Sequence, residues 1–233
     1  MPDYGAIYRT RAADYDLMVS REDIYGNIAK AIQAVQPIEN TVIVDFGAGT
    51  GRLTRLVAPL ARYVIACDIS THMLAQARGS LPRYAPPSQW GIAVGDNRHM
   101  PLPADMADIA LAGWSFGHSL TWFQEQWQDA IAAAISEMAR VLRPDGVAII
   151  LETMGTGAET PMPPTESLAT YYAWLETELG YAGQTFRTDY RFESLAEAER
   201  LTRFFFGDAL AERVVNEGLQ VLPECTGMWW RRF

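Results

Sequence analysis

The chain has 233 residues, of which 49% are hydrophobic and 20% are charged. These values match ordinary globular proteins and exclude a disordered or collagen-like chain. One domain of this length buries enough apolar surface to fold without a disulfide framework or a structural metal. The 19 Lys and Arg residues against 28 Asp and Glu residues give a net charge of −9. Because like charges repel, this charge disfavours nucleic acid and anionic membranes as partners.

The two cysteines, Cys67 and Cys225, are far apart and do not have the pattern of a disulfide framework or a metal site. We therefore expect no bound metal. No basic-then-apolar leader and no apolar run of about 18 residues is visible. The cytoplasm is the expected compartment. The sequence is compatible with a homodimer but contains no signal for one.

Near-continuous apolar runs of strand length recur along the first two thirds of the chain. Between them lie segments with helical periodicity, and this alternation predicts a parallel sheet covered on both faces. The predicted strands are residues 41–46, 63–68, 89–95, 107–114 and 147–151.

Capping residues and apolar spacing locate the intervening helices. Ser70 predicts the start of a helix over residues 70–77. Thr121 and Gln124 have capping-box spacing, which predicts a helix that continues to the turn at residues 143–146. A further helix face has the spacing i, i+3, i+4, i+7 and consists of Leu53, Leu56, Val57 and Leu60.

The two ends of the chain depart from this alternation. We predict one α/β domain over residues 1–233, with a mostly parallel, seven-stranded sheet in a three-layer sandwich. Its parts are a helical lid over residues 1–38, a cofactor-binding core over residues 41–152, and an insertion plus sheet completion over residues 153–233. Within the last part we predict a loop and helix at 155–183, strands at 184–192 and 219–231, and a helix at 194–206.

The strongest local signal is the run VDFGAGTGR at residues 44–52, between a predicted strand and a predicted helix. Glycines let the backbone approach a ligand, and the helix N-terminus offers free N–H donors. A dinucleotide site requires the spacing G-x-G-x-x-G. Here the spacing is G-x-G-x-G, and Arg52 stands where the third glycine would be.

Acidic residues stand at the ends of three successive predicted strands. Asp45 lies two positions before the first glycine, Asp68 ends the second strand, and Asp96 follows the third. The carboxyl ends of parallel strands meet at one edge of a sheet, so these carboxylates are expected to form one site. Such a site suits a cationic ligand that carries a ribose, and Asp68 can accept hydrogen bonds from both ribose hydroxyls.

These elements together resemble the class I S-adenosylmethionine-dependent methyltransferases. VDFGAGTGR is similar to their first motif, Asp68 to their acidic residue after strand two, and Gly95-Asp96 to their adenine-contacting segment. EMARVLRPDGVAII at residues 137–150 is similar to the block before their fifth strand. The resemblance covers roughly residues 41–152 and implies a Rossmann-like fold with S-adenosyl-L-methionine as cofactor.

The resemblance also implies a set of cofactor contacts. Asp45 would hold the amino group of the methionine part, Asp68 the ribose, Ile69 the adenine ring, and Asp96 the adenine amino group. Trp114 would edge the methyl-transfer cleft, and Tyr15, in a Tyr-Asp element, would cover the methionine end. The remaining expected cofactor-site residues are Gly47, Ala48, Gly49, Gly51, Met73 and Asn97.

The chemistry of such a donor requires proximity and exclusion of water more than a dedicated catalytic group. If the acceptor carries a proton, His118 after the fourth strand is the candidate general base, and Glu152 is comparable. For both, a structural role is the more common alternative. Tyr4 and Tyr8 are candidates for closing the site.

We therefore predict an enzyme that transfers a methyl group from S-adenosyl-L-methionine to a small molecule by in-line displacement. One alternative is a non-catalytic domain of the same fold, whose cleft would be plugged. A nicotinamide-dependent oxidoreductase is a second alternative, but its glycine fingerprint is absent. The motifs do not identify the acceptor or the atom that is methylated.

Overall fold

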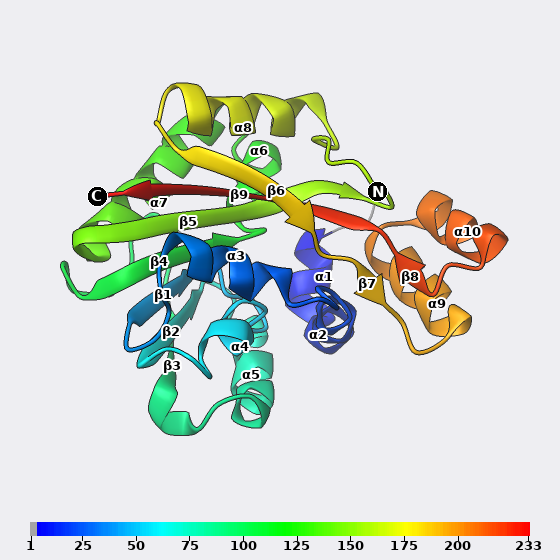
Figure 1. The fold of residues 1–233 in the computed structure, drawn as a ribbon, viewed down its shortest axis with the longest axis horizontal. Helices are drawn as coiled ribbons and strands as arrows, with labels where there is room; N and C mark the ends of the chain where they lie inside the picture. Colours follow the sequence, from blue (N-terminus) through cyan, green and yellow to red (C-terminus); the bar gives the residue numbers. More distant parts are fainter. Residues whose placement is uncertain (1–3) are drawn as a thin grey trace.

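A computed structural model describes residues 4–233, in which one seven-stranded sheet carries the fold (Figure 1). Strands β1, β2, β3, β4 and β5 pair in parallel, whereas β9 is antiparallel to both β5 and β6. The predicted mostly parallel sheet is thus confirmed. In spatial order the strands are β3 (Trp90–Val94), β2 (Tyr63–Asp68), β1 (Val42–Phe46), β4 (Ala107–Gly113), β5 (Leu142–Thr156), β9 (Glu224–Arg232) and β6 (Ala182–Arg187).

The order of these strands locates the site. The chain winds outward from β1 to β2 and β3, then crosses back to β4 and β5 on the other side of β1. In an open α/β sheet the loops diverge at this reversal and leave a crevice at the carboxyl ends of the strands. The crevice therefore lies beyond the carboxyl ends of β1 and β4.

Helices cover both faces of the sheet because side chains alternate along buried strands. Ile43 of β1 packs with Ile28 and Ile32 of α3, whereas its neighbour Val44 belongs to the cluster that contains Ile131 of α7. The main-sheet helices are α3 (Asn27–Val35), α4 (Thr54–Val57), α5 (Thr71–Ser80), α6 (Ser119–Trp122), α7 (Trp127–Val141) and α8 (Glu166–Thr177). Short 3-10 turns are η1 (Leu81–Arg83), η2 (Pro87–Gln89), η3 (Phe116–His118) and η4 (Gln124–Gln126).

Two N-terminal helices lie in the segment that was expected to be a lid over residues 1–38, whereas α3 of that segment packs against the sheet. α1 (Tyr4–Thr10) and α2 (Ala12–Ser20) pack against α5, and α2 also packs against α9. Arg55 of α4 ties the lid to the core because its Nη2 donates to the Val19 carbonyl (2.7 Å). Residues 1–3 of the predicted lid lie outside the described residues.

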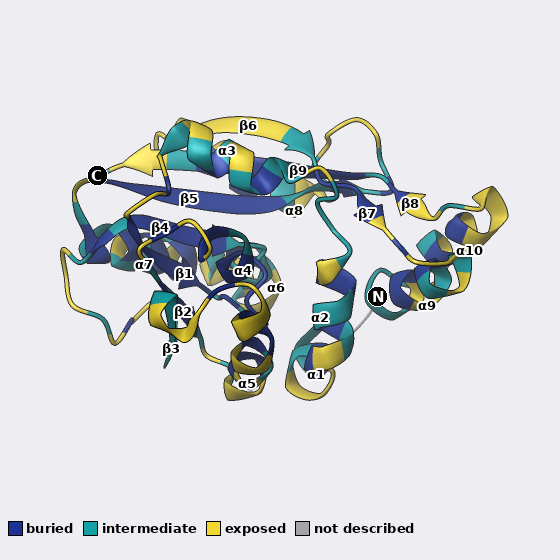
Figure 2. Ribbon diagram, turned by 60° about the horizontal axis from the view of Figure 1, so that its bottom comes forward, coloured by how far each residue is buried: buried dark blue, intermediate teal, exposed yellow. Residues whose placement is uncertain are grey.

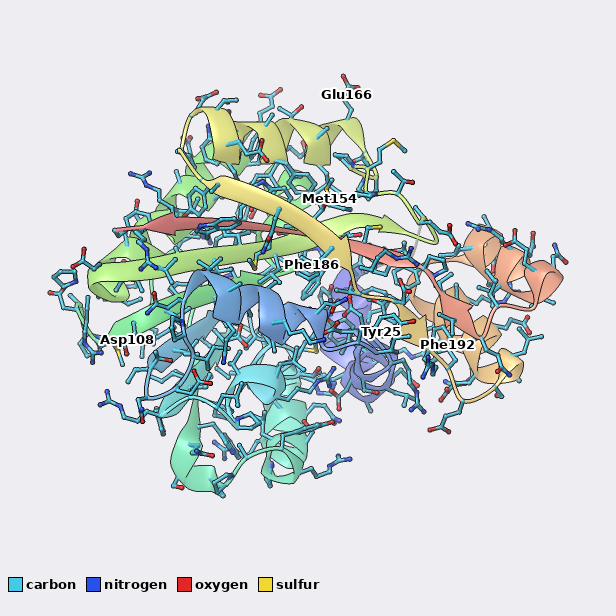
Figure 3. All side chains as sticks on the ribbon, viewed as in Figure 1. Tyr25, Asp108, Met154, Glu166, Phe186 and Phe192 are labelled. Atoms are coloured by element: carbon cyan, nitrogen blue, oxygen red, sulfur yellow. The ribbon has the colours of Figure 1, made fainter. Side chains whose placement is uncertain are left out.

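The segment between β6 and β9 forms a separate small lobe. It contains β7 (Tyr190–Arg191), α9 (Leu195–Phe205), α10 (Asp208–Glu217) and β8 (Val221–Leu222). Phe192, labelled in Figure 3, belongs to an apolar cluster that the lobe shares with Met18 of α2. Both ribbon views place α9 and α10 at the end of the molecule away from the C-terminus (Figures 1 and 2).

This lobe corrects the prediction for the C-terminal third. The single strand expected over residues 184–192 is divided into β6 and β7, which belong to different sheets, and the strand expected over 219–231 is divided into β8 and β9. The helix expected over residues 194–206 is present as α9, whose N-cap is the Ser194 side chain, but α10 was not predicted. Where the lobe interrupts the sheet, its residues pack in an apolar cluster together with Met18 of α2.

Two local predictions are also wrong. Thr121 lies inside the short helix α6, and α7 begins at Trp127 without a side-chain cap, so no capping box forms. β5 starts at Leu142, directly after α7, because the chain end supports this segment: the Asp145 amide donates to the Phe233 carbonyl (2.8 Å). Within residues 4–233, no helix is both long and apolar enough to cross a membrane.

Candidate active site

The turn after β1 forms the floor of the site. Gly47 and Gly49 have φ values of +66° and +57°, a left-handed conformation that L side chains adopt with strain. A Cβ on Gly47 would overlap the Ser115 Oγ. The Ala48 amide is fixed by donating to the Cys67 carbonyl (2.8 Å). The turn therefore requires glycine for both backbone geometry and space.

Asp45 lies beneath this turn and is 1% exposed. One of its oxygens, Oδ2, accepts from both the amide and the hydroxyl of Thr54 (3.1 and 2.6 Å). Burial raises the pKa of Asp45 to about 7, the hydrogen bonds from Thr54 oppose this shift, and the charge of Asp68 adds to it. Its proton occupancy thus depends on what else occupies the cavity.

Asp68, at the end of β2, links two turns of the site. Its Oδ2 accepts from the Gly49 amide (2.8 Å) and its Oδ1 from the Ser70 amide (2.7 Å). Burial raises its pKa despite these hydrogen bonds. Ile69 follows and is 68% exposed, which leaves an apolar side chain free to cover a flat ring.

Asp96 and Asn97 lie after β3. Asp96 pairs with the Arg98 guanidinium through both oxygens (2.9 and 2.6 Å), which lowers its pKa. Asn97 Nδ2 donates to the Ser115 Oγ (3.0 Å), so the loops after β3 and β4 are joined beside Gly47.

Arg52 is the main site residue whose role the sequence did not reveal. It is 8% exposed, forms an ion pair with Glu22 of the lid, and lies 3.2 Å from the centroid of the Trp114 ring. Its Nε has no hydrogen-bond partner in residues 4–233. Trp114 itself has φ +49°, an uncommon value that places its ring under the guanidinium. The available signal was the arginine at the position of the third fingerprint glycine.

An aromatic cluster encloses the other end. His118 is joined to Tyr8 of the lid (Tyr8 Oη to His118 Nε2, 2.9 Å) and stacks on Trp122 at a ring-centroid distance of 5.0 Å. Tyr4 contacts His118 and also Phe205 of the small lobe. Burial lowers the pKa of His118 to about 4, so the imidazole is neutral near pH 7.

Glu152 lies behind this cluster at the end of the central part of β5. Its Oε1 accepts from the Gly117 amide (2.8 Å). Burial raises its pKa to about 8, which keeps the carboxyl protonated at neutral pH. Glu152 forms no ion pair with any residue in the range 4–233.

These residues surround one cavity of about 330 Å³. It is lined by nearly all expected site residues from separate elements: Tyr15, Asp45, Gly47, Ala48, Gly49, Asp68, Ile69, Met73, Asp96, Asn97, Trp114 and His118. Gly51 is the exception, because the Cβ position on its α-carbon faces Leu81 and Ala77 instead. The open volume does not fit the plugged cleft of a non-catalytic domain. No cluster of three potential metal ligands occurs in residues 4–233.

Comparison with known proteins supports the fold and the family resemblance. Residues 44–150 match the family described as methyltransferase domain. This match and the similarity to proteins named methyltransferases support the resemblance to class I S-adenosylmethionine-dependent methyltransferases. The cofactor of this family is S-adenosyl-L-methionine, as the resemblance implied.

Curated relatives of this methyltransferase domain include two proteins named malonyl-[acyl-carrier protein] O-methyltransferase. The one from Yersinia pestis is 29% identical over 158 residues, which cover 66% of this chain and 51% of the relative. The one from Methylococcus capsulatus is 34% identical over 61% of this chain and 48% of the relative. The chain thus spans about half the length of these relatives.

Solved structures share the fold of the methyltransferase. A putative methyltransferase from Bacillus halodurans has a TM-score of 0.57 at 18% identity, over 88% of this chain and 98% of that chain. A phosphoethanolamine N-methyltransferase from Haemonchus contortus, solved with S-adenosylhomocysteine, has a TM-score of 0.52 at 14% identity. The latter match covers 97% of this chain and 47% of that chain.

Proposed function

We propose that the protein transfers the methyl group of S-adenosyl-L-methionine to a small-molecule acceptor by in-line displacement. The observation that carries this proposal is the shared cavity, in which a glycine turn and three strand-end carboxylates adjoin an aromatic end. The aromatic lining and the net charge of −9 favour a small acceptor over nucleic acid. A homodimer remains compatible with this proposal and is not required by it.

The residues of the cavity fit the cofactor by two tests. The first is space: a Cβ on Gly49 would point toward Met73 and Tyr15, which line the cavity, so the glycine leaves room there. The second is the set of polar groups, because carboxylates suit the amino group, the ribose hydroxyls and the adenine amine. Asp45, Asp68 and Asp96 would take these groups in that order, Asn97 would assist beside Asp96, and Ile69 would cover the adenine ring.

Arg52 completes this set. Its buried, unpartnered Nε lies near the glycine turn, where the carboxylate of the methionine part would need a cation. Glu22 and Trp114 hold the guanidinium on its other sides. The donor sulfonium makes the methyl group electrophilic, so this chain's residues need only align the acceptor and exclude water.

The role of His118 as general base stays a prediction. A group with a pKa of about 4 is a weak base near pH 7. The hydrogen bond to Tyr8 supports positioning of the acceptor by His118 at least as well as proton transfer.

Titration calorimetry with S-adenosylhomocysteine tests the proposal. We expect a micromolar dissociation constant, which corresponds to about −8 kcal/mol. NADH, titrated under the same conditions, is expected to produce no binding heat. Absence of binding by S-adenosylhomocysteine would refute the proposed function.

A further inference from the structure

We propose that the methyl acceptor is a carboxylate and that Arg9 of the lid is the residue that binds it. This inference rests on the proposed methyl transfer and assigns its substrate class. It follows from the charges that line the cavity, the use of the ring faces around it, and the chemistry that each acceptor class demands.

The arginines that line the cavity include one without an ion pair among the described residues. Three arginines line the cavity, namely Arg9, Arg52 and Arg98. Arg52 pairs with Glu22 and Arg98 pairs with Asp96. Arg9, in the last turn of α1, has no ion pair or side-chain hydrogen bond to any residue in the range 4–233. One cation at the mouth of the cavity therefore lacks a counter-charge that an anionic ligand would supply.

The carboxylates that line the cavity are confined to one part of it. Asp45, Asp68 and Asp96 all line the cavity at the strand ends, which is the donor half. The part of the lining without carboxylates is apolar, aromatic and hydroxyl-bearing and includes Tyr8, Phe116, His118, Trp122 and Phe123, and Arg9 follows Tyr8 on α1. A protonated amine would find no carboxylate among them.

Aromatic rings can also bind an ammonium group, but only through open faces. The Arg98 guanidinium lies 4.6 Å from the centroid of the Phe123 ring and covers one of its faces. His118 stacks on Trp122 with an interplanar angle of 17°. Tyr8 contacts both Tyr15 and His118 edge to face. These contacts already occupy one face of Phe123 and one face of Trp122 and pack Tyr8 against its neighbours, so the rings are not arranged as an open cage for a cation.

A carboxylate acceptor can be methylated without a general base. A carboxylate oxygen attacks the methyl carbon with its own electron pair, and the carbon–sulfur bond breaks with its pair going to sulfur. The products are a methyl ester and a neutral thioether, so no proton is released and no base is required. This suits a site in which His118 shares a hydrogen bond with Tyr8 and Glu152 accepts from the Gly117 amide.

Acceptor preference tests the substrate class. We would incubate the enzyme with methyl-tritiated S-adenosyl-L-methionine and matched acids, alcohols and amines that carry phenyl, C4, C8 or C12 bodies. Mild alkali releases volatile methanol from methyl esters but not from ethers or amines. We expect alkali-labile label from acids and none from the matched alcohols and amines. Label in ether or amine products, or no acid methylated by a protein that binds S-adenosylhomocysteine, would overturn the inference.

Variants of Arg9 test the residue. Arg9→Gln should raise the KM for the accepted acid about tenfold or more, with a smaller change in kcat, because the ion pair exists before the reaction. Arg9→Lys should recover part of the affinity. Arg11→Gln is the matched control, because Arg11 is on the same lid, pairs with Asp14 and does not line the cavity.

The remaining outcomes separate the two proposals. The dissociation constant for S-adenosylhomocysteine should be unchanged in Arg9→Gln. If that constant rises while the acceptor KM stays constant, Arg9 serves the donor and the inference is wrong. An unchanged KM in Arg9→Gln would also refute it. If the wild-type protein does not bind S-adenosylhomocysteine, the proposed function itself fails.

Discussion

The protonated carboxyl of Glu152 predicts that the protein loses stability as the pH rises. Glu152 is 4% exposed, and burial raises its pKa from 4.5 to about 8. Below pH 4.5 the carboxyl is protonated in both the folded and unfolded states and contributes no pH dependence. Above pH 4.5 the unfolded chain releases the proton and the folded chain does not, so rising pH stabilises the unfolded state relative to the folded state. Between pH 5 and pH 8 this linkage costs about 3–4 kcal/mol of unfolding free energy.

The variant Glu152→Gln removes the titration and keeps an oxygen that can accept from the Gly117 amide. Urea unfolding, followed by circular dichroism at pH 5, 6, 7 and 8, measures the free energy of each protein. The unfolding free energy of the variant, measured relative to that of the wild type, should increase by about 3–4 kcal/mol from pH 5 to pH 8. Glu178→Gln, at an exposed position on the end of α8, should show the wild-type slope. Parallel pH slopes for Glu152→Gln and wild type would refute the reasoning.

Three further predictions concern the donor half. Asp68→Ala should weaken S-adenosylhomocysteine binding by about 1–3 kcal/mol in calorimetry, the scale of lost charge-assisted hydrogen bonds; an unchanged constant would remove Asp68 from the site. Gly47→Ala should lower stability by about 1–3 kcal/mol, because Gly47 has a left-handed φ and a Cβ there would meet Ser115. Gly79→Ala, in open helical surroundings, should raise stability by about 0.5–1 kcal/mol. Thermal melts with the opposite order would contradict this. Arg52→Gln should cost about 3–5 kcal/mol in urea unfolding because it leaves Glu22 buried and unpaired, and adding Glu22→Gln should recover much of that loss; strictly additive losses would show that the two side chains act independently.

The donor half of the cavity could be predicted from sequence because its signals are local. Each buried strand is a near-continuous apolar run, and each carboxylate stands at the end of such a run. Parallel pairing then brings Asp45 and Asp68 to one edge without any further information. Ile69 could be placed beside them because it follows Asp68 directly in the chain.

The acceptor half could not be predicted in this way because it depends on contacts between distant segments. Tyr8 and His118 are 110 residues apart in sequence and share a hydrogen bond. Arg52 and Glu22 are 30 residues apart, and no periodicity connects them. The capping-box prediction at Thr121 failed for a related reason: short local signals compete with tertiary packing, which here favours a break between α6 and α7.

The small lobe influences the acceptor half through the lid and not through the cavity wall. None of the cavity-lining residues belongs to residues 188–222, yet Phe205 of α9 contacts both Tyr4 and Tyr15. Tyr15 in turn contacts Tyr8, which binds His118. A chain of packed rings therefore runs from α9 to the acceptor pocket, whereas the carboxylates of the donor half are fixed by backbone amides and by Thr54 and Arg98. Because Tyr15 is also expected to cover the methionine end of the cofactor, sequence changes on α9 are expected to alter both the acceptor pocket and this part of the donor site, while the strand-end carboxylates keep their own contacts.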